Sequence, residues 1–251
     1  MAAFSILSVM AMQEFQQGNQ YFIFNQDCSF EPKSSFFEPS FWQQQGRVLG
    51  AAKGRGTTYF VSAQDYFGCD CALRHYYRGG LWGKFNRDRY RLGALAQTRS
   101  FAEFRLLHQL HAAGLAVPKP IAARVTIGRL GICYQADILL EKLQDGEDLC
   151  AYLVRNNLNG TEWQRIGGLI RQMHDLQVCH TDLNAHNIFV QEKGEKQYWL
   201  LDFDKCGLQP GEHWKSNNLE RLHRSFLKEV GRMGIHFTEA DWQQLKSGYQ
   251  G

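Results

Sequence analysis

Apolar residues recur every three or four positions in two stretches of the chain, which is the spacing of an amphipathic helix. The first stripe consists of Phe101, Phe104, Leu107 and Leu110. It predicts a helix that begins near residue 98 and stops at Gly114. The second stripe consists of Trp163, Ile166, Ile170 and Met173. Thr161 and Gln164 have the spacing of a capping box, so this helix is predicted to run from Thr161 to about Gln177.

Short strand-like runs with glycine between them dominate the N-terminal third of the chain. Residues 48–62 have the pattern of a strand, a glycine turn and a second strand, and residues 69–77 have the pattern of another. Pro118 and Pro120 are expected to break the chain. Residues 132–143 predict a buried strand. Such runs favour an antiparallel sheet.

A hairpin is predicted in the C-terminal half. Residues 187–191 and 197–201 have strand patterns, and residues 192–195 have turn chemistry. Residues 143–149 predict a loop, and the polar stretch 213–247 predicts helix. The order is sheet, helix, strand and then helices around a hairpin. This order indicates an α+β protein whose sheet lies toward the N-terminus.

Composition limits the class of protein. The 251 residues are 44% hydrophobic and 21% charged, as in ordinary globular proteins, and a net charge of +3 is too small to indicate nucleic-acid binding. The seven cysteines are odd in number and form no CxxC pair, which favours reduced thiols in the cytoplasm over disulfides or zinc. The N-terminus lacks the basic start of a signal peptide. No apolar run reaches the ~20 residues of a membrane span, so any membrane contact is expected to be peripheral.

The predicted hairpin would bring three oxygen-bearing side chains to one rim. Asn187 begins its first strand, Asp202 follows its second strand, and Asp182 lies in the loop before it. Phosphoryl transfer needs Mg²⁺ on the phosphates and a carboxylate that orients the attacking hydroxyl. Asn187 and Asp202 match metal ligands, and Asp182 matches a catalytic base. The alternative makes Asp182 a polar helix-end residue and Asp202 a turn residue, which leaves their ordered spacing unexplained.

The sequence HTDLNAHN at 180–187 resembles the catalytic loop of protein-kinase-like phosphotransferases, and DFD at 202–204 resembles their metal-binding DFG element. The resemblance implies a bilobal protein-kinase-like fold that uses ATP and Mg²⁺. Residues 1–142 would form a nucleotide-binding lobe with an antiparallel sheet and one helix. Residues 143–251 would form a mainly helical catalytic lobe, with ATP between the two.

The same resemblance suggests phosphate-binding residues in the N-terminal lobe. Gly54 and Gly56 stand where the family has a glycine-rich phosphate cover, although a plain glycine hairpin is an equal alternative. Arg74 stands in place of the strand lysine, where it would bind phosphate or would be a surface strand arginine. Glu103 stands where a helix glutamate would pair with Arg74, but it also completes a capping box with Ser100.

Two further assignments depend on position in the resemblance. The main chain of Glu141 and Leu143 would hold adenine at the hinge between the lobes. His180 is expected to support the catalytic loop by packing and hydrogen bonding rather than by proton transfer.

Departures from the protein-kinase pattern narrow the class of molecule that could accept the phosphate. Thr181 replaces an arginine that reads activation-loop phosphate, Asn184 replaces the catalytic-loop lysine, and Asp204 replaces the glycine of DFG. No APE element follows. These features point to a small-molecule or glycolipid acceptor without activation-loop control.

Residues 74–91 combine six Lys or Arg with several aromatic residues and one Asp. Arg78, Lys84 and Arg87 are the candidates for binding an anionic acceptor, and the aromatic residues could meet lipid headgroups. The alternative is a solvated charged loop, which is the commoner meaning of such a run.

Three segments, LRHYYRGGLWGKF, HTDLNAHNIF and LLDFDK, together resemble the bacterial lipopolysaccharide-core kinase family over about residues 30–230. This resemblance implies ATP-dependent phosphorylation of the sugar 3-deoxy-D-manno-octulosonic acid (Kdo) at its 4-hydroxyl, on a Kdo-lipid A type glycolipid. It also implies a peripheral position on the cytoplasmic face of the bacterial inner membrane. Neither nucleic acid nor an obligate protein partner is expected. A heptose kinase of the same family, a small protein kinase and a non-catalytic nucleotide-binding module are the alternatives.

Overall fold

The computed structural model describes residues 12–25, 33–53, 56–78 and 88–251. The chain divides into two compact units, which are described separately. Unit 1 comprises Met1–Ala112 with Lys119–Lys142, and unit 2 comprises Ala113–Pro118 with Leu143–Gly251.

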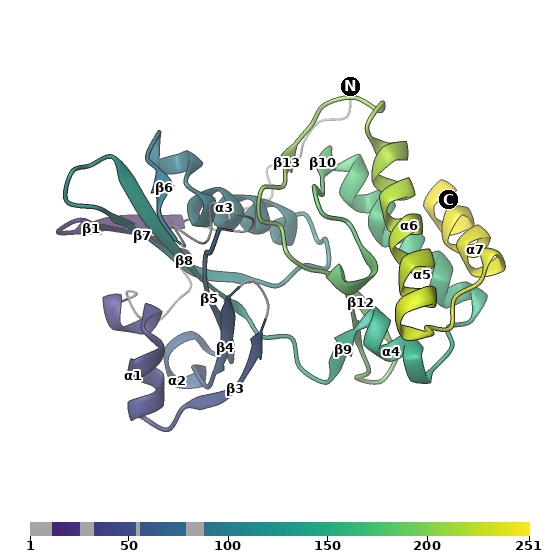
Figure 1. The fold of residues 1–251 in the computed structure, drawn as a ribbon, viewed down its shortest axis with the longest axis horizontal. Coiled ribbons are helices and arrows are strands. Elements are labelled where there is room, and N and C mark those ends of the chain that lie inside the picture. Colours follow the sequence, from purple (N-terminus) through teal and green to yellow (C-terminus); the bar gives the residue numbers. More distant parts are fainter. Residues whose placement is uncertain (1–11, 26–32, 54–55, 79–87) are drawn as a thin grey trace. The chain divides into compact units, whose positions relative to one another are not determined.

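Unit 1 is built on one antiparallel sheet (Figure 1). Its strands follow the order β1-β2-β7-β8-β5-β4-β3, and β6 pairs with the first residues of β8. The strands are β1 Met12–Gln17, β2 Gln20–Asn25, β3 Val48–Lys53, β4 Thr57–Val61, β5 Cys71–His75, β6 Tyr90–Arg91, β7 Pro120–Ile127 and β8 Cys133–Glu141. Within the described residues, the helices of unit 1 are η1 Ser34–Phe37, α1 Pro39–Gln44, α2 Gln64–Phe67, η3 Leu95–Gln97 and α3 Arg99–Ala112.

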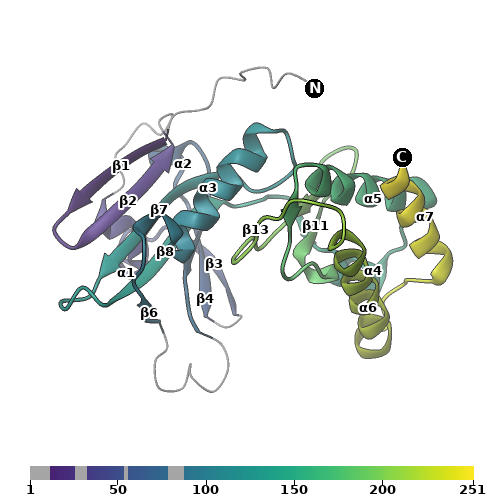
Figure 2. The same ribbon diagram turned by 90° about the horizontal axis from the view of Figure 1, so that it is seen from above.

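Both faces of this sheet are covered, because successive strand residues point to opposite sides. In β2, Phe22 packs with Trp42 of α1 in one core, whereas Ile23 packs with Phe101 and Phe104 of α3 in the other. The helix α3 lies along β7 and β8 on its face of the sheet (Figure 2). The sheet therefore holds α3, and with it Glu103, in a fixed place relative to β5.

Most elements predicted for unit 1 are confirmed. The hairpin of 48–62 is β3 and β4, and the run 69–77 contains β5. The helix near residue 98 is α3, and 132–143 contains β8. One helix was expected in this part of the chain, but the structure has the short helices α1 and α2 in addition to α3.

The expectation that Pro120 breaks the chain is wrong. Pro120 is the first residue of β7, a position where proline's missing N–H is tolerated in a strand. The strand β7 lies in the middle of the sheet, between β2 and β8.

Unit 2 is mainly helical. Its helices are α4 Leu149–Arg155, α5 Gly160–Asp175, η4 Ala185–Asn187, α6 Lys215–Met233 and α7 Glu239–Gln250. Its strands form a sheet of order β12-β11-β9 and a separate pair β10-β13. They are β9 Gly146–Asp148, β10 Val178–Cys179, β11 Ile188–Gln191, β12 Gln197–Leu200 and β13 Gly207–Leu208. The expected α+β class is therefore confirmed.

The second predicted helix exists, but its predicted cap is wrong. The capping box of α5 is made by Asn159 and Glu162, two residues before Thr161 and Gln164. Asn159 has extended backbone, and its side chain accepts a hydrogen bond from the backbone N–H of Glu162 at 3.0 Å. Thr161 already lies inside the first turn, so it cannot act as the cap.

Of the other two C-terminal expectations, one needs correction and one is confirmed. The loop predicted for 143–149 contains β9, which pairs with β11, and α4 begins at its last residue. The helical stretch 213–247 is two helices. Gly234 ends α6 with a left-handed φ of 68°, and Thr238 caps α7.

The helices α5 and α7 touch through glycines. A Cβ atom on Gly167 would lie 2.0 Å from the carbonyl oxygen of Leu245, and one on Gly248 would lie 2.0 Å from that of Gln164. Since both neighbours are backbone atoms, only glycine permits this approach. Among the helices of the described residues, none combines the length and the apolar character needed to cross a bilayer.

Candidate active site

The predicted hairpin is formed by β11 and β12, with Ile188 opposite Leu200 and Gln191 opposite Gln197. At its open end the backbone N–H of Leu201 donates to the carbonyl oxygen of Asn187 at 2.9 Å. The residue directly after Leu201 is Asp202. The hairpin thus brings Asn187 and the segment entering Asp202 together, as the sequence predicts.

Asp182 is held by its backbone. The side-chain amides of Asn184 and Asn187 both donate to the carbonyl oxygen of Asp182, each at 2.9 Å. Asn184 also caps the turn η4, because its Oδ1 accepts from the N–H of His186 at 2.9 Å. These bonds fix the loop around Asp182, whose side chain remains 41% exposed. A half-exposed carboxylate on a loop fixed by hydrogen bonds can accept the proton of a substrate hydroxyl.

His180 is the buried support of this loop. Its Nε2 donates to the carbonyl oxygen of Leu201 at 2.9 Å, and its Nδ1 accepts from the N–H of Asp182 at 3.2 Å. Its ring also packs edge-on against Phe203. Burial lowers the pKa of His180, against the bond to Leu201 and the charges of Asp202 and Asp182. The ring is therefore neutral, which matches one donating and one accepting nitrogen, and the supporting role expected of His180 is confirmed.

Asp202 has left-handed backbone, with a φ of 60°. This conformation costs a non-glycine residue about 1–2 kcal/mol and turns the chain sharply after β12. Strain of this kind concentrates at functional sites.

The donor set of Asn187 and Asp202 fits Mg²⁺. The Nδ2 atom of Asn187 is engaged by Asp182, so Oδ1 is the atom left to act as a ligand. Asp202 supplies carboxylate oxygens. Both are the hard oxygen donors that Mg²⁺ prefers, usually one or two from the protein with the rest from phosphates and water.

The helix α6 contacts the loop 180–187 through three side chains, and the sequence did not predict these contacts. Asn218 donates from Nδ2 to the carbonyl oxygen of His180 at 2.7 Å. Arg221 binds the carboxylate of Asp182 through Nη2, and Ser225 Oγ accepts from the N–H of Ala185 at 3.1 Å. One face of α6 thereby orders the whole loop. A polar helix was predicted here, but its partners lie about 40 positions away in sequence, so no local pattern reveals them.

A second buried network extends from Asn218 to the C-terminus. His174 Nε2 donates to Asn218 Oδ1 at 2.9 Å, and the hydroxyl of Tyr249 donates to His174 Nδ1 at 2.9 Å. Burial lowers the pKa of His174, so its ring is neutral and can accept the tyrosine bond. The helices α5, α6 and α7 are joined at this point.

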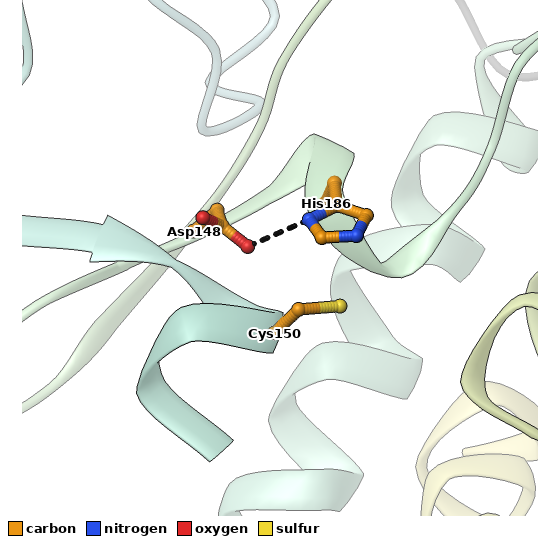
Figure 3. Close-up of side chains that lie close together, drawn as sticks. All are labelled: Asp148, Cys150 and His186. Atoms are coloured by element: carbon orange, nitrogen blue, oxygen red, sulfur yellow. Dashed lines mark hydrogen bonds and ion pairs between the residues drawn. The ribbon is translucent and has the colours of Figure 1, made fainter. Parts of the chain in front are cut away.

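Asp148, Cys150 and His186 form a cluster of metal-ligand residue types, with ligand atoms within 4.8 Å of one another (Figure 3). His186 Nδ1 is hydrogen-bonded to Asp148 Oδ1 at 2.9 Å, and Arg232 donates to His186 Nε2 at 2.9 Å. Asp148 Oδ1 also accepts from the N–H of Ala151 at the start of α4. Burial raises the pKa of Cys150 to about 12, so this thiol is protonated. Hydrogen bonds already use both ring nitrogens of His186 and the Oδ1 atom of Asp148, so the cluster is a polar contact between α4 and η4.

In unit 1, Arg74 and Glu103 form the expected pair. Arg74 Nη2 lies 2.6 Å and 2.5 Å from the two carboxylate oxygens of Glu103, and the hydroxyl of Tyr76 donates to Glu103 Oε2 at 2.5 Å. Glu103 is 1% exposed and Arg74 is 24% exposed. Burial and the charge of Glu103 raise the pKa of Tyr76 well above its usual value, so it stays a donor.

The alternatives for these two residues are wrong. Ser100 lies inside α3, and its hydroxyl donates to the carbonyl oxygen of Arg124 at 3.0 Å, so it makes no capping box with Glu103. Arg74 is tied to a buried carboxylate, so it is not a solvent-facing strand arginine.

Gly56 has a packing role. A Cβ atom there would lie 2.1 Å from the Tyr77 ring, so a larger residue would clash. Gly54 lies outside the described residues, and the phosphate-binding role of both glycines stays a prediction.

At the proposed hinge, the N–H of Glu141 donates to the carbonyl oxygen of Lys119 at 2.8 Å. The carbonyl of Glu141, rather than its N–H, is then the group that could meet adenine. Leu143 is the first residue of the second segment of unit 2.

Of the three candidates for acceptor binding, Arg78 donates from Nε to the carbonyl oxygen of Arg89 at 2.7 Å and lies over the Tyr90 ring. Lys84 and Arg87 lie outside the described residues.

Comparison with known proteins shows the family of this chain. Residues 39–249 match the family described as the lipopolysaccharide kinase (Kdo/WaaP) family. A relative named 3-deoxy-D-manno-octulosonic acid kinase, from Haemophilus influenzae (strain PittEE), is 63% identical over 240 residues, covering 95% of this chain and 99% of the relative. A relative of the same name from Pasteurella multocida (strain Pm70) is 55% identical over 240 residues, covering 95% and 100%.

One solved structure is similar in fold. It is titled "WaaP in complex with acyl carrier protein", with a TM-score of 0.55 and 16% sequence identity over 85% of this chain and 86% of that chain. At this identity the likeness concerns the fold alone.

Proposed function

The chain belongs to the lipopolysaccharide kinase (Kdo/WaaP) family, and on that premise we propose that it transfers the γ-phosphate of ATP to a hydroxyl of Kdo. The acceptor is a Kdo-lipid A type glycolipid, and the hydroxyl is the one at position 4 of the sugar. The observation that carries the proposal is the joined loop and hairpin. Hydrogen bonds within unit 2 join the loop that carries Asp182 to the hairpin ends that carry Asn187 and precede Asp202.

Asp182 accepts or orients the proton of the acceptor hydroxyl. Its backbone is fixed by Asn184, Asn187 and the ring of His180. Its carboxylate is bound by Arg221. Orientation of this kind provides most of what a protein contributes to phosphoryl transfer.

Asn187 and Asp202 would hold Mg²⁺. When bound, the metal neutralises charge on the phosphates of ATP. Asn187 presents Oδ1 because its Nδ2 is fixed to Asp182, and Asp202 presents its carboxylate where the chain turns after β12.

Residues 1–142 act as the nucleotide-binding lobe and residues 143–251 as the catalytic lobe. Arg74 binds phosphate oxygens, with Glu103 and Tyr76 setting the position of its guanidinium. Gly54 and Gly56 offer backbone N–H groups to phosphate, and Glu141 and Leu143 hold adenine by their main chain.

The basic stretch 74–91 meets the acceptor. Arg78, Lys84 and Arg87 contribute to binding anionic groups of the glycolipid, at the cytoplasmic face of the bacterial inner membrane, where the protein is peripheral. The charge and aromatic content of this stretch support the assignment.

The test is an acceptor comparison. Purified protein is incubated with ATP and Mg²⁺ and with either a Kdo-bearing lipid A, a heptose-bearing core lipid or a peptide mixture. Mild acid then releases the sugars for mass spectrometry. Phosphate on Kdo is the expected result. Phosphate on heptose would establish the heptose-kinase alternative, phosphate on peptide would establish a protein kinase, and no transfer to any acceptor would contradict the proposal.

A further inference from the structure

The catalytic loop has no cation of its own. Residues 180–187, HTDLNAHN, contain no lysine or arginine, and Asn184 stands where protein kinases carry a lysine. Both ends of the Asn184 amide are engaged inside the loop, one by Asp182 and one by His186. A positive charge beside Asp182 must therefore come from another element.

Arg221 supplies that charge from α6. Its Nη2 binds Asp182 Oδ1, although the two residues are 39 positions apart in sequence. The side chain of Arg221 is 48% exposed and that of Asp182 is 41% exposed, so both are open to a solute. Within the described part of the chain, Arg221 makes no hydrogen bond other than this one. A guanidinium has five N–H donors, so most of its donors remain available for a second acceptor.

The proposed substrate requires a cation at this place. Kdo is a sugar acid, and its carboxylate belongs to the same sugar as the hydroxyl that receives phosphate. The carboxylate is attached two ring positions away from that hydroxyl, so when Asp182 holds the hydroxyl, both acid groups lie at the same sugar ring. Two carboxylates brought together repel each other unless a cation lies between them. Arginine suits this position because its planar fork can bind two carboxylates at once.

We propose that Arg221 is the binding site for the acceptor's carboxylate, so that Asp182 and the sugar acid are bridged by one guanidinium. The inference rests on the proposed function. It makes Arg221 a determinant of acceptor specificity: the enzyme selects a sugar that has an acid group on the same ring as the reacting hydroxyl. Asn218 and Ser225 lie on the same face of α6 and bind the loop. These two contacts fix the position of the Arg221 backbone relative to Asp182.

A simple surface ion pair is the competing explanation. Under that explanation, Arg221 orients the carboxylate of Asp182 and makes no contact with the acceptor. The two explanations differ in what happens when the acceptor loses its acid group, because only a direct contact couples Arg221 to that group.

The experiment pairs a protein change with an acceptor change. Wild type, Arg221→Ala and Arg221→Lys are assayed with a Kdo-lipid A acceptor and with the same acceptor after conversion of the Kdo carboxylate to its methyl ester. The measured quantity is kcat/KM for the acceptor. Arg224→Ala is the control, since Arg224 lies on the same helix, is 67% exposed and pairs with Glu220. Melting temperatures verify that all variants are folded.

The wild type should prefer the acid over the ester by about 10- to 100-fold, the size of one charge-assisted hydrogen bond. Arg221→Ala should lose most of this preference, Arg221→Lys should keep part of it, and Arg224→Ala should keep all of it. The affinity for ATP should be unchanged in each. If Arg221→Ala slows both acceptors equally and retains the preference, the inference is wrong although the proposed function stands. If the wild type phosphorylates no Kdo at all, the proposed function itself fails and the inference fails with it.

Discussion

The ring of His180 donates from Nε2 to the carbonyl oxygen of Leu201 at 2.9 Å, which ties the loop before Asp182 to the strand end before Asp202. Both ring nitrogens are used and the side chain is 0% exposed. One buried neutral imidazole thus links the proposed base to the proposed metal ligand.

Replacement of His180 by alanine should destabilise the protein by about 2–4 kcal/mol, because it leaves buried polar groups unpaired and opens a cavity beside Phe203. The effect should depend on pH. The pKa of folded His180 is lowered, so its contribution is present above the unfolded value of about 6.5 and is lost as pH falls below it. Urea unfolding of wild type and His180→Ala at about pH 7.5 and about pH 5.5 measures this. A stability difference that grows at the lower pH would contradict it.

His75 should show the opposite dependence. Its Nδ1 lies 2.7 Å from Asp137 Oδ1 and its Nε2 lies 3.3 Å from Asp88 Oδ2. Burial acts to lower the pKa of His75, but these two carboxylates outweigh it and raise the pKa. The stability it contributes is therefore complete below about pH 6.5 and is lost as pH rises through the folded pKa.

The variant His75→Gln tests this sign. The loss of unfolding free energy relative to wild type should be larger at about pH 6 than at about pH 9. Equal losses at both values would show that the imidazolium charge is not what stabilises this site.

The contact between α5 and α7 depends on Gly167. Gly167→Ala should destabilise the protein by about 3 kcal/mol, since a Cβ would meet the carbonyl oxygen of Leu245 at 2.0 Å. Gly168→Ala is the matched control, because its Cβ would find its nearest neighbour at 3.8 Å. That change should be neutral or stabilising by about 0.5–1 kcal/mol, as expected for glycine replacement inside a helix. Thermal melting that ranks the two variants alike would contradict the close approach of the helices.

Replacement of Arg74 should raise the KM for ATP more than the KM for the acceptor. Arg74→Ala removes the proposed phosphate contact and leaves the buried carboxylate of Glu103 with one partner fewer, so KM for ATP should rise at least about tenfold. Arg47→Ala is the control. It breaks the Arg47–Asp65 ion pair, whose aspartate is 69% exposed, and should leave KM unchanged. Steady-state kinetics with varied ATP measures both. An unchanged KM in Arg74→Ala would remove Arg74 from the nucleotide site.

Local sequence patterns predict the elements that depend on local physics. The stripe of α3 and the alternating strands of the 187–201 hairpin need only neighbouring residues, and both are confirmed. The cap of α5 was placed two residues late, because Asn159 and Thr161 are both good caps and only the observed backbone of Asn159 distinguishes them.

Long-range contacts are what the sequence could not provide. The strand β7 was missed because Pro120 reads as a break unless its place at the start of a strand is known. Arg221 was missed because its partner Asp182 is brought to it by the packing of α6 on the loop. The motif residues 180–187 and 202–204 were recognisable since their chemistry is encoded in short segments.

The most direct measurement compares wild type and Asp182→Ala in one assay. Each is incubated with ATP, Mg²⁺ and a Kdo-lipid A acceptor, and the intact glycolipid is analysed by mass spectrometry, with Asp175→Ala as an exposed aspartate control. Wild type and Asp175→Ala should add one phosphate to the Kdo residue. Asp182→Ala should bind ATP normally and transfer phosphate at least about 10²-fold more slowly. Near-normal transfer by Asp182→Ala, or an unmodified Kdo residue with the wild type, would contradict the account.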